Sequence, residues 1–330
     1  MPIVTVFGGS GFVGRYVAKK LAKRGWRVRC AVRRPNEAMF LRPYGDVGQV
    51  EPVQANVRHE ESTHAAIRGA DAVVNLVAIL FPSGSQTFES VQKEGAERIA
   101  RLCAEEGIER VVHVSAIGAD AESDIPYHRT KAEAEAAMRE HVPSSVIMRP
   151  SLVFGPEDQF FNRFAGIARL SPVMPLIGAK TRFQPVYVGD VAEAIVRALE
   201  NDECQGKTYE LGGPEIVTMR EVYDKVLEET RRSRLVLPMP WGLAKAQAWF
   251  MELPHRTLGI PPMLTRDQVR MLREDNVVAD DALTLEDLDI VPVTMDAILP
   301  TYLYRYRPYG QYSRMRPHDA RIVEEQQADG

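Results

Sequence analysis

Short apolar runs alternate with helical patterns along the first 150 residues. Each run is rich in β-branched side chains, and each helical segment carries apolar residues at three- and four-residue spacing. The runs predict strands at residues 3–7, 27–32, 50–54, 72–78, 110–115 and 145–148. The helical patterns cover residues 12–24, 60–67, about 88–106 and 127–141. This alternation predicts an α/β fold with a doubly wound parallel sheet, in which ligands bind at the carboxyl ends of the strands.

The first strand leads directly into a glycine-rich turn, and a helical pattern follows it. Gly8, Gly11 and Gly14 have GxxGxxG spacing, while Gly9 with the last two gives GxGxxG. In either spacing one glycine makes a tight turn, one lets backbone N–H groups approach a pyrophosphate, and one allows close helix packing. The helix N-terminus would then face the phosphates. The predicted phosphate site consists of Gly8, Gly11, Phe12, Val13 and Gly14.

The end of the second strand indicates which dinucleotide binds. An NAD site usually has an Asp or Glu about 20 residues after the glycines, which accepts a hydrogen bond from the ribose 2′-hydroxyl. Arg33 and Arg34 stand in that place, and an arginine can form two parallel hydrogen bonds with a 2′-phosphate. Two arginines before Pro35 are also typical of a solvated surface that binds nothing. Because a glycine-rich phosphate turn precedes them, we interpret them as ligands of NADP(H).

A second group of residues has the chemistry of a proton-transfer site. Ser115 ends the fifth strand, and Tyr127 and Lys131 form a YxxxK pair one helical turn apart, so that they share a helix face. A lysine ammonium beside a phenol is expected to lower the pKa of the phenol towards the value that a proton donor to a carbonyl needs. The serine hydroxyl could hold the carbonyl oxygen. On its own, a YxxxK pair is more often an ordinary helix surface.

These motifs resemble those of the short-chain dehydrogenase/reductase superfamily, in its extended or atypical branch. The resemblance rests on FGGSGFVG at 7–14, NLVA at 75–78, RPSLVFGPED at 149–158 and QPVYVGDVAEAI at 184–195, together with Ser115, Tyr127 and Lys131. It implies a Rossmann-like domain with a bound dinucleotide. The residues that it assigns to the nucleotide are Asn56 and Val57 at the adenine, Val77 and Ala78 at the nicotinamide ribose, Lys131 at the ribose hydroxyls, and Pro150 and Val153 at the nicotinamide.

Composition excludes several classes of protein. With 330 residues, of which 45% are apolar and 26% charged, the chain is an ordinary globular protein of one large or two interlocked domains. Its net charge of −4 gives no reason to expect nucleic-acid binding. The three cysteines form no CxxC pair and the seven histidines lack an acidic cluster, so neither a disulfide framework nor a metal is expected. No run approaches the ~18 apolar residues of a membrane span.

The rest of the chain narrows the resemblance. The segments 157–165, 184–192 and 284–312 are similar to the nucleotide-binding accessory subunits of respiratory complex I, the proton-pumping NADH:ubiquinone oxidoreductase. This resemblance implies a non-catalytic subunit that holds NADP(H), contacts other complex I subunits and stabilises the peripheral arm near the membrane. Because Ser115, Tyr127 and Lys131 are all present, a soluble NADP-dependent reductase or sugar-nucleotide epimerase/dehydratase is the alternative. The first strand begins two residues after Met1, so no presequence is expected, which favours a bacterial protein at the cytoplasmic face of the inner membrane.

The chain is expected to form three parts. Residues 1–213 would be the NADP(H)-binding domain, with 156–182 contributing to a smaller subdomain, and 214–300 would complete that C-terminal α/β subdomain. Residues 301–330 would be a docking tail, since 301–318 contain five tyrosines, four arginines and no acid. Tyrosine and arginine are enriched at protein interfaces. The tract Tyr302–Arg316 also suits an anionic membrane surface.

Overall fold

Seven parallel strands form the central sheet of the computed structural model, which describes residues 1–258, 262 and 264–310. Their order is β11-β6-β5-β4-β1-β2-β3, and every neighbouring pair is parallel. The strands are β1 (Ile3–Phe7), β2 (Arg27–Val32), β3 (Val50–Gln54), β4 (Ala72–Asn75), β5 (Val111–Val114), β6 (Val146–Pro150) and β11 (Thr208–Leu211). The predicted doubly wound sheet is confirmed.

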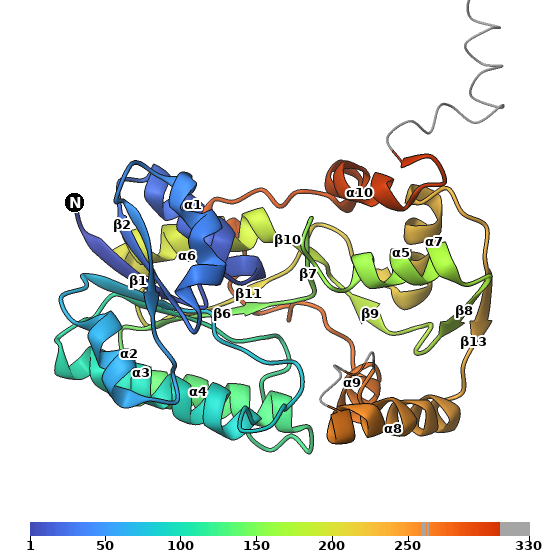
Figure 1. Ribbon diagram of the computed structural model, residues 1–330, viewed down its shortest axis with the longest axis horizontal. Coiled ribbons are helices and arrows are strands. Elements are labelled where there is room, and N and C mark those ends of the chain that lie inside the picture. The colour runs from blue at the N-terminus through green and yellow to red at the C-terminus, as the bar shows by residue number, and fades with distance from the viewer. Residues whose placement is uncertain (259–261, 263, 311–330) are drawn as a thin grey trace, which may run out of the picture.

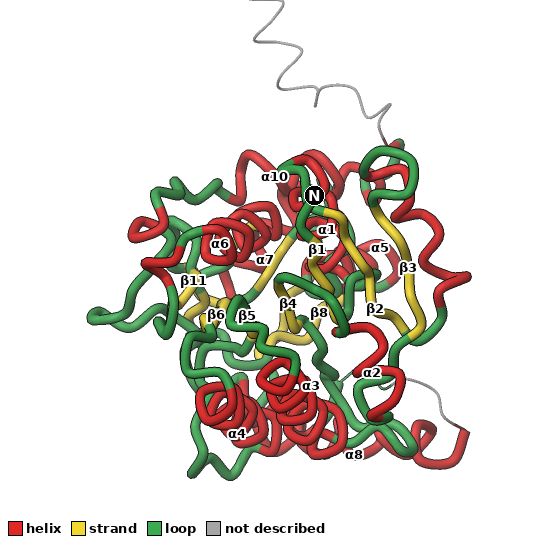
Figure 2. The backbone as a smooth tube through the Cα atoms, turned by 90° about the vertical axis from the view of Figure 1, so that its left-hand side faces the viewer, coloured by secondary structure: helices red, strands yellow, loops and turns green. Residues whose placement is uncertain are grey.

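Helices cover both faces of this sheet (Figures 1 and 2). One face carries α1 (Phe12–Lys23) and α6 (Val188–Glu200); the other carries α2 (Glu60–Ile67), α3 (Glu94–Glu105) and α4 (Pro126–His141). Side chains alternate between the faces, so Val4 and Val6 pack with Leu21 of α1, whereas Val73 packs with Met138 of α4. Because both faces are covered, the strands need continuous apolar runs, and β4 and β5 are buried throughout.

The structure differs from the predicted elements at three places. β4 ends at Asn75 and not at residue 78, because the Asn75 side chain accepts a hydrogen bond from the Val77 backbone and turns the chain away. The long helix begins with a π-helical turn, Glu89–Lys93, before α3. β11 was not expected, and it adds a seventh strand beside β6.

A smaller lobe lies to the right of the sheet in Figure 1. Its helices are α5 (Phe161–Leu170), α7 (Met219–Glu229), α8 (Trp241–Leu258), α9 (Arg266–Met271) and α10 (Met295–Leu303). Short two-stranded sheets lie in this lobe or link it to the central sheet. They are β8 (Val173–Leu176) with β13 (Leu235–Pro238), β9 (Arg182–Phe183) with β12 (Val217–Thr218), and β7 (Val153–Phe154) with β10 (Val186–Tyr187). Short 3-10 helices span Pro35–Tyr44, Asp202–Cys204, Glu286–Leu288 and Tyr304–Tyr306. A capping box formed by Thr218 and Glu221 begins α7.

The start of the expected docking tail is part of this lobe. Tyr302 is 4% exposed, and its hydroxyl donates a 2.6 Å hydrogen bond to the buried carboxylate of Asp158. Leu303 is fully buried, and Arg307 forms an ion pair with Glu229. A tail that begins at residue 301 is therefore wrong for residues 301–310, since Tyr302 and Arg307 bind within the lobe, although Tyr304 and Tyr309 are exposed. Residues 311–330, with the rest of the tract, lie outside the described residues.

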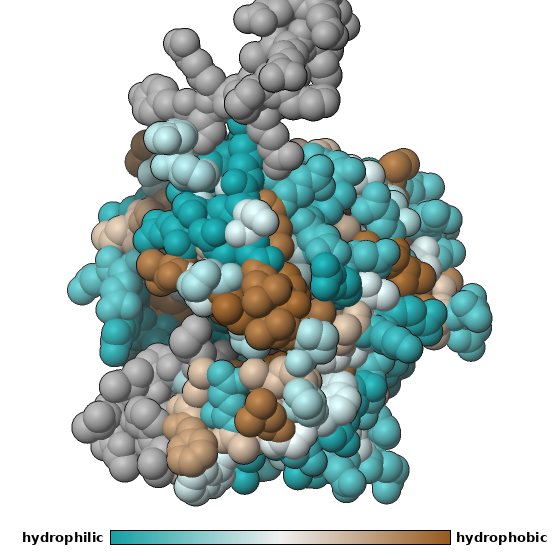
Figure 3. Space-filling view, turned by 90° about the vertical axis from the view of Figure 1, so that its right-hand side faces the viewer, coloured by the Kyte–Doolittle hydropathy of each residue, from teal (hydrophilic) through white to brown (hydrophobic). Residues whose placement is uncertain are grey.

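Apolar side chains are exposed at the end of the lobe that is farthest from the central sheet. Figure 3 shows a hydrophobic area in the middle of this face, with hydrophilic surface around it. The exposed apolar residues of the elements at this end are Leu170, Val173, Leu235 and Leu237 on and beside β8 and β13, and Leu243, Trp249 and Phe250 on α8. Within the described ranges, no helix has the length and apolar character needed to cross a membrane.

We predict that Tyr302→Phe lowers the free energy of unfolding by about 1–3 kcal/mol, because the buried Asp158 carboxylate loses its hydroxyl donor. Urea unfolding measures the change. The control is Tyr304→Phe, two residues away at an exposed side chain, for which a change below about 0.5 kcal/mol is expected. Equal destabilisation by the two substitutions would contradict the assignment of the 301–310 segment to the core.

Candidate nucleotide-binding site

The glycine turn brings the start of α1 into direct contact with the end of β1. Gly8 has a φ of +78°, and the Gly11 N–H donates to its carbonyl oxygen at 2.9 Å. A Cβ on Gly14 would overlap the Gly8 carbonyl oxygen and would lie 2.7 Å from the Gly9 Cα. Only glycine fits at Gly14, which both spacings share. Gly8 has a left-handed backbone and a Cβ on Gly9 would lie 2.9 Å from the Cys30 Cβ, so the turn uses the glycines of both spacings.

The N-terminus of α1 has the properties of an anion site. Gly11 is the N-cap residue and supplies no side-chain cap, and the first turn contains no acidic residue. The N–H groups of that turn therefore lack an internal anionic partner, and the helix dipole favours a negative charge there. The close glycine packing and the uncapped helix fit the pyrophosphate of a dinucleotide.

The other predicted nucleotide residues lie at the same edge of the sheet. Since all seven strands are parallel, the segments that follow them leave from one edge. The residues on these segments are Arg33 and Arg34 after β2, Asn56 and Val57 after β3, Val77 and Ala78 after β4, Ser115 after β5, Pro150 at the end of β6 and Val153 in β7. Their individual contacts with a nucleotide stay predictions.

Lys131 does not act on Tyr127 as expected. The Lys131 ammonium is 2% exposed and donates a 2.8 Å hydrogen bond to the backbone carbonyl of Val114, and burial lowers its pKa to about 8. Burial raises the pKa of Tyr127 to about 12. The predicted lowering of the tyrosine pKa is therefore wrong: both residues lie on α4, but desolvation opposes the phenolate.

A buried polar group behind the edge was missed in the sequence. His113 lies in β5 opposite Asn75 of β4, and its Nδ1 is 3.1 Å from the Asn75 Nδ2. Asn75 accepts from Val77 through Oδ1, so its amide nitrogen donates to His113, which leaves the imidazole proton on Nε2. Burial, and then the charge of Lys131, lower the pKa of His113 to about 3. The available signal was a polar residue inside an apolar strand, VVHV.

Two buried polar atoms at this site have no hydrogen-bond partner within the described protein: His113 Nε2 and Ser115 Oγ. The two residues are two positions apart along the chain at the end of β5, which puts them on the same side. Buried polar groups are normally hydrogen-bonded, so an unpartnered serine hydroxyl at the ligand edge fits a bound polar group. This observation, with the glycine turn, supports a nucleotide site here.

A pocket of about 450 Å³ opens beside the β5–α4 loop. Its lining residues are Gly118, Ala119, Asp120, Ser123, Asp124, Ile125, His128 and Glu274. His128 is buried, and its Nδ1 lies 3.7 Å from the Glu274 carboxylate, which comes from the smaller lobe. The pocket therefore has room for a small molecule at the boundary of the two lobes.

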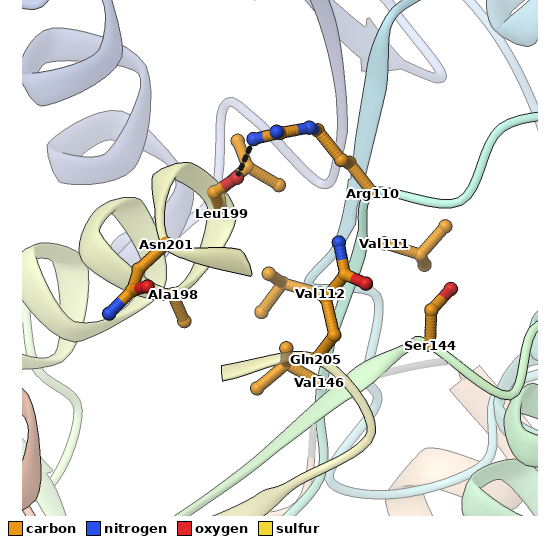
Figure 4. Close-up of a pocket in the computed structure, with 9 residues that line it drawn as sticks. All are labelled: Arg110, Val111, Val112, Ser144, Val146, Ala198, Leu199, Asn201 and Gln205. Atoms are coloured by element: carbon orange, nitrogen blue, oxygen red, sulfur yellow. Dashed lines mark hydrogen bonds between the residues drawn. The ribbon is translucent and has the colours of Figure 1, made fainter. Parts of the chain in front are cut away.

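A second cavity, shown in Figure 4, measures about 10 Å³ and lies at the amino ends of β5 and β6. There the Arg110 side chain donates to the Leu199 carbonyl at 3.1 Å. The cavity has room for about one water molecule and is at the edge opposite the glycine turn, so it is not a ligand site.

Comparison with known proteins gives a family match and relatives that align with most of this chain. The model of the NAD dependent epimerase/dehydratase family matches residues 4–212. The chain is 37% identical to the Arabidopsis thaliana mitochondrial protein NADH dehydrogenase [ubiquinone] 1 alpha subcomplex subunit 9, over 93% of this chain and 79% of the relative. It is 31% identical to the mitochondrial NADH-ubiquinone oxidoreductase 40 kDa subunit of Neurospora crassa, over 93% of this chain and 80% of that one.

Solved structures share the fold at low sequence identity. An NADPH-dependent quinone oxidoreductase from Escherichia coli, in complex with NADPH, superposes with a TM-score of 0.69 at 17% identity, covering 91% of this chain and 98% of the other. A nucleoside-diphosphate-sugar epimerase from Staphylococcus aureus gives 0.68 at 16% identity, covering 92% and 99%. These likenesses show the fold alone.

We predict that Gly14→Ala abolishes retention of bound nucleotide and lowers the melting temperature, because the new methyl group overlaps the Gly8 carbonyl. The matched control is Gly166→Ala in α5, where no atom lies within 4 Å of the added Cβ. Alanine should stabilise that helix by about 0.5–1 kcal/mol. Nucleotide released on denaturation and thermal melting are the measurements; retention of nucleotide by Gly14→Ala would contradict the close packing.

We predict that His113 makes the protein less stable at acidic pH. Its pKa falls from an ordinary 6.5 to about 3 on folding, so between these values the unfolded chain binds a proton that the folded chain does not. Stability is then lost as the pH drops below about 6.5, by up to about 1.4 kcal/mol per pH unit. Between pH 7 and pH 5, His113→Gln should lose about 2 kcal/mol less unfolding free energy than the wild type, with the exposed His59→Gln as control. An unchanged pH dependence would exclude a neutral buried His113.

Proposed function

Because the chain belongs to the NAD dependent epimerase/dehydratase family and, within it, to the complex I accessory subunits represented by the Arabidopsis and Neurospora proteins, we propose that it is a non-catalytic NADP(H)-binding subunit of respiratory complex I. It would stabilise the peripheral arm near the membrane, at the cytoplasmic face of a bacterial inner membrane. The observation that carries the proposal is identity of 30% or more with several such subunits over 93% of the chain.

NADP(H) is favoured over NAD(H) by the segment after β2. No acid stands at the position that would accept from a ribose 2′-hydroxyl, and Arg33 and Arg34 are there instead. The two arginines differ in their partners. Arg34 pairs with Glu37 on the surface at 2.9 Å, whereas Arg33 contacts the neutral amide of Gln86. Arg33 is therefore the better candidate for a 2′-phosphate ligand.

A holding role is favoured over catalysis by the state of Tyr127 and Lys131. A proton donor needs a pKa near the working pH, whereas burial raises that of Tyr127 to about 12. The Lys131 ammonium is engaged with the Val114 carbonyl. Ser115, Tyr127 and Lys131 would then bind the nicotinamide half of the nucleotide without transferring a proton.

The exposed apolar residues Leu170, Val173, Leu235 and Leu237 are our candidate docking surface for the complex. Leu235 and Leu237 point outwards from β13, while Val236 between them packs on the lobe core. A strand that is apolar on both faces needs a partner on its outer face. The edge of this surface is basic, because Arg169 and Arg234 lie near Arg232. Burial, and then the charges of these two arginines, lower the pKa of Arg232. The partner subunit would offer an apolar centre with an acidic border.

We predict that the tagged full chain, extracted gently from native membranes, co-purifies with NADH:quinone oxidoreductase and releases NADP(H) on denaturation. Migration of the protein alone would contradict the subunit role, and release of mainly NAD(H) would contradict the cofactor assignment. In the same preparation, Tyr127→Phe should leave turnover nearly unchanged, because a subunit that only holds the nucleotide transfers no proton through this residue. A large loss of turnover with assembly intact would favour the alternative, a reductase or epimerase that uses Ser115, Tyr127 and Lys131.

The docking surface has its own control in this experiment. Serine at both Leu235 and Leu237 should reduce recovery of the complex several-fold while the nucleotide content stays unchanged. Val291→Ser, at another exposed apolar side chain of 88% exposure, should recover the complex in full. Equal recovery with the β13 double variant would exclude this surface.

A further inference from the structure

The loop between β4 and α3, residues 76–88, reaches the ends of two other strands. It begins against the glycine turn, where the Leu76 carbonyl would lie 3.4 Å from a Cβ on Gly8. The loop contains a tight turn, Ser83 to Gln86, closed by backbone hydrogen bonds of 2.9 and 3.0 Å between these two residues, with Gly84 at a φ of +55°. In the sheet order, β1 separates β4 from β2 and β3. The loop therefore extends past β1 along the ligand edge.

Two arginines hold this turn, one from the end of each neighbouring strand. Arg33, after β2, donates through Nη1 to the Gln86 side-chain oxygen. Arg58, after β3, donates through Nη1 to the Ser85 carbonyl at 2.9 Å and to the Ser85 hydroxyl at 2.7 Å. Since Ser85 and Gln86 are consecutive, the two guanidinium groups come close together at the adenosine end of the edge.

Neither guanidinium has an acidic partner in the part of the chain that the structure describes. Among the described residues, no carboxylate oxygen lies within 4.0 Å of Arg33 or Arg58, although the adjacent Arg34 pairs with Glu37. A guanidinium has five N–H donors, and each of these two uses one nitrogen on the turn. Two adjacent cations with neutral partners and spare donors are an arrangement that a doubly charged anion would stabilise.

We propose that Arg58 is a second ligand, with Arg33, of the ribose 2′-phosphate of NADP(H), and that the turn from Ser83 to Gln86 positions both guanidinium groups. The proposal rests on the NADP(H) assignment above and adds a residue that the position after β2 does not identify. The phosphate would lie between the two arginines, and the turn would cover it from the β4 side. Discrimination between NADP(H) and NAD(H) then depends on the ends of two strands and one loop.

The test is titration of the full chain, freed of its endogenous nucleotide, with NADPH and separately with NADH. Arg58→Gln should weaken NADPH binding about tenfold or more and change NADH binding less than twofold, because only NADPH carries the 2′-phosphate. Arg33→Gln should have the same selective effect. The matched control is Arg42→Gln, an exposed arginine on the 3-10 helix Pro35–Tyr44 with the same change of charge, for which less than a twofold effect on either nucleotide is expected.

Other outcomes would overturn the proposal in separable ways. If Arg58→Gln binds NADPH as tightly as Arg42→Gln does, Arg58 does not contact the phosphate and only this inference fails. If it weakens NADPH and NADH equally, Arg58 acts on the fold of the loop and not on the phosphate. Arg58→Lys, which keeps the charge without the planar fork, separates a folding defect from a lost ligand, since it should retain part of the NADPH selectivity. A wild type that binds NADH as tightly as NADPH would overturn the NADP(H) assignment itself.

Discussion

The contact between Gly14 and the Gly8 carbonyl is the constraint on which the rest of the site depends. It lets α1 start directly above the end of β1, so that the uncapped helix N-terminus lies at the ligand edge. The same helix packs against α6 through the apolar core and reaches the smaller lobe, where Arg15 and Tyr16 bind Glu157 at 3.3 and 2.9 Å. A side chain at Gly14 would displace the helix, and with it the phosphate site and a contact between the lobes.

Regular apolar patterns in the sequence predicted the sheet well, and irregular ones did not. β1, β2, β3 and α2 have the predicted bounds, because their periodic patterns are short and clearly delimited. The two-residue strand pairs are too short to have a period, and β11 lies in a segment whose pattern was not distinctive. β4 stops early because the Val77 N–H donates a hydrogen bond to the Asn75 side-chain oxygen. The pattern of apolar residues does not predict such a contact.

The site was predictable in place but not in chemistry. The parallel order of the strands alone places Ser115, the glycines and the arginines at one edge of the sheet, and side-chain contacts are not needed to predict this. Spacing puts Tyr127 and Lys131 on one helix face, but it does not say that the lysine reaches the Val114 carbonyl or that burial raises the pKa of the tyrosine. Arg58 was missed for a related reason: its importance comes from a contact with Ser85, 27 residues away in the chain.

The tyrosines and arginines after Thr301 show why residue type alone does not identify an interface. The residues that suit a contact with another protein also suit a contact within the chain, since both need apolar area together with directed hydrogen bonds. Here Tyr302 binds Asp158, Arg305 donates to the Pro156 carbonyl at 2.8 Å, and Arg232 donates to the Tyr306 carbonyl at 2.9 Å. These bonds fix the last described turn of the chain to the segment before α5 and the segment after α7. On the same lobe Tyr302 is buried, whereas Leu235 and Leu237 of β13 are exposed, so here an apolar strand and not this tyrosine faces outwards.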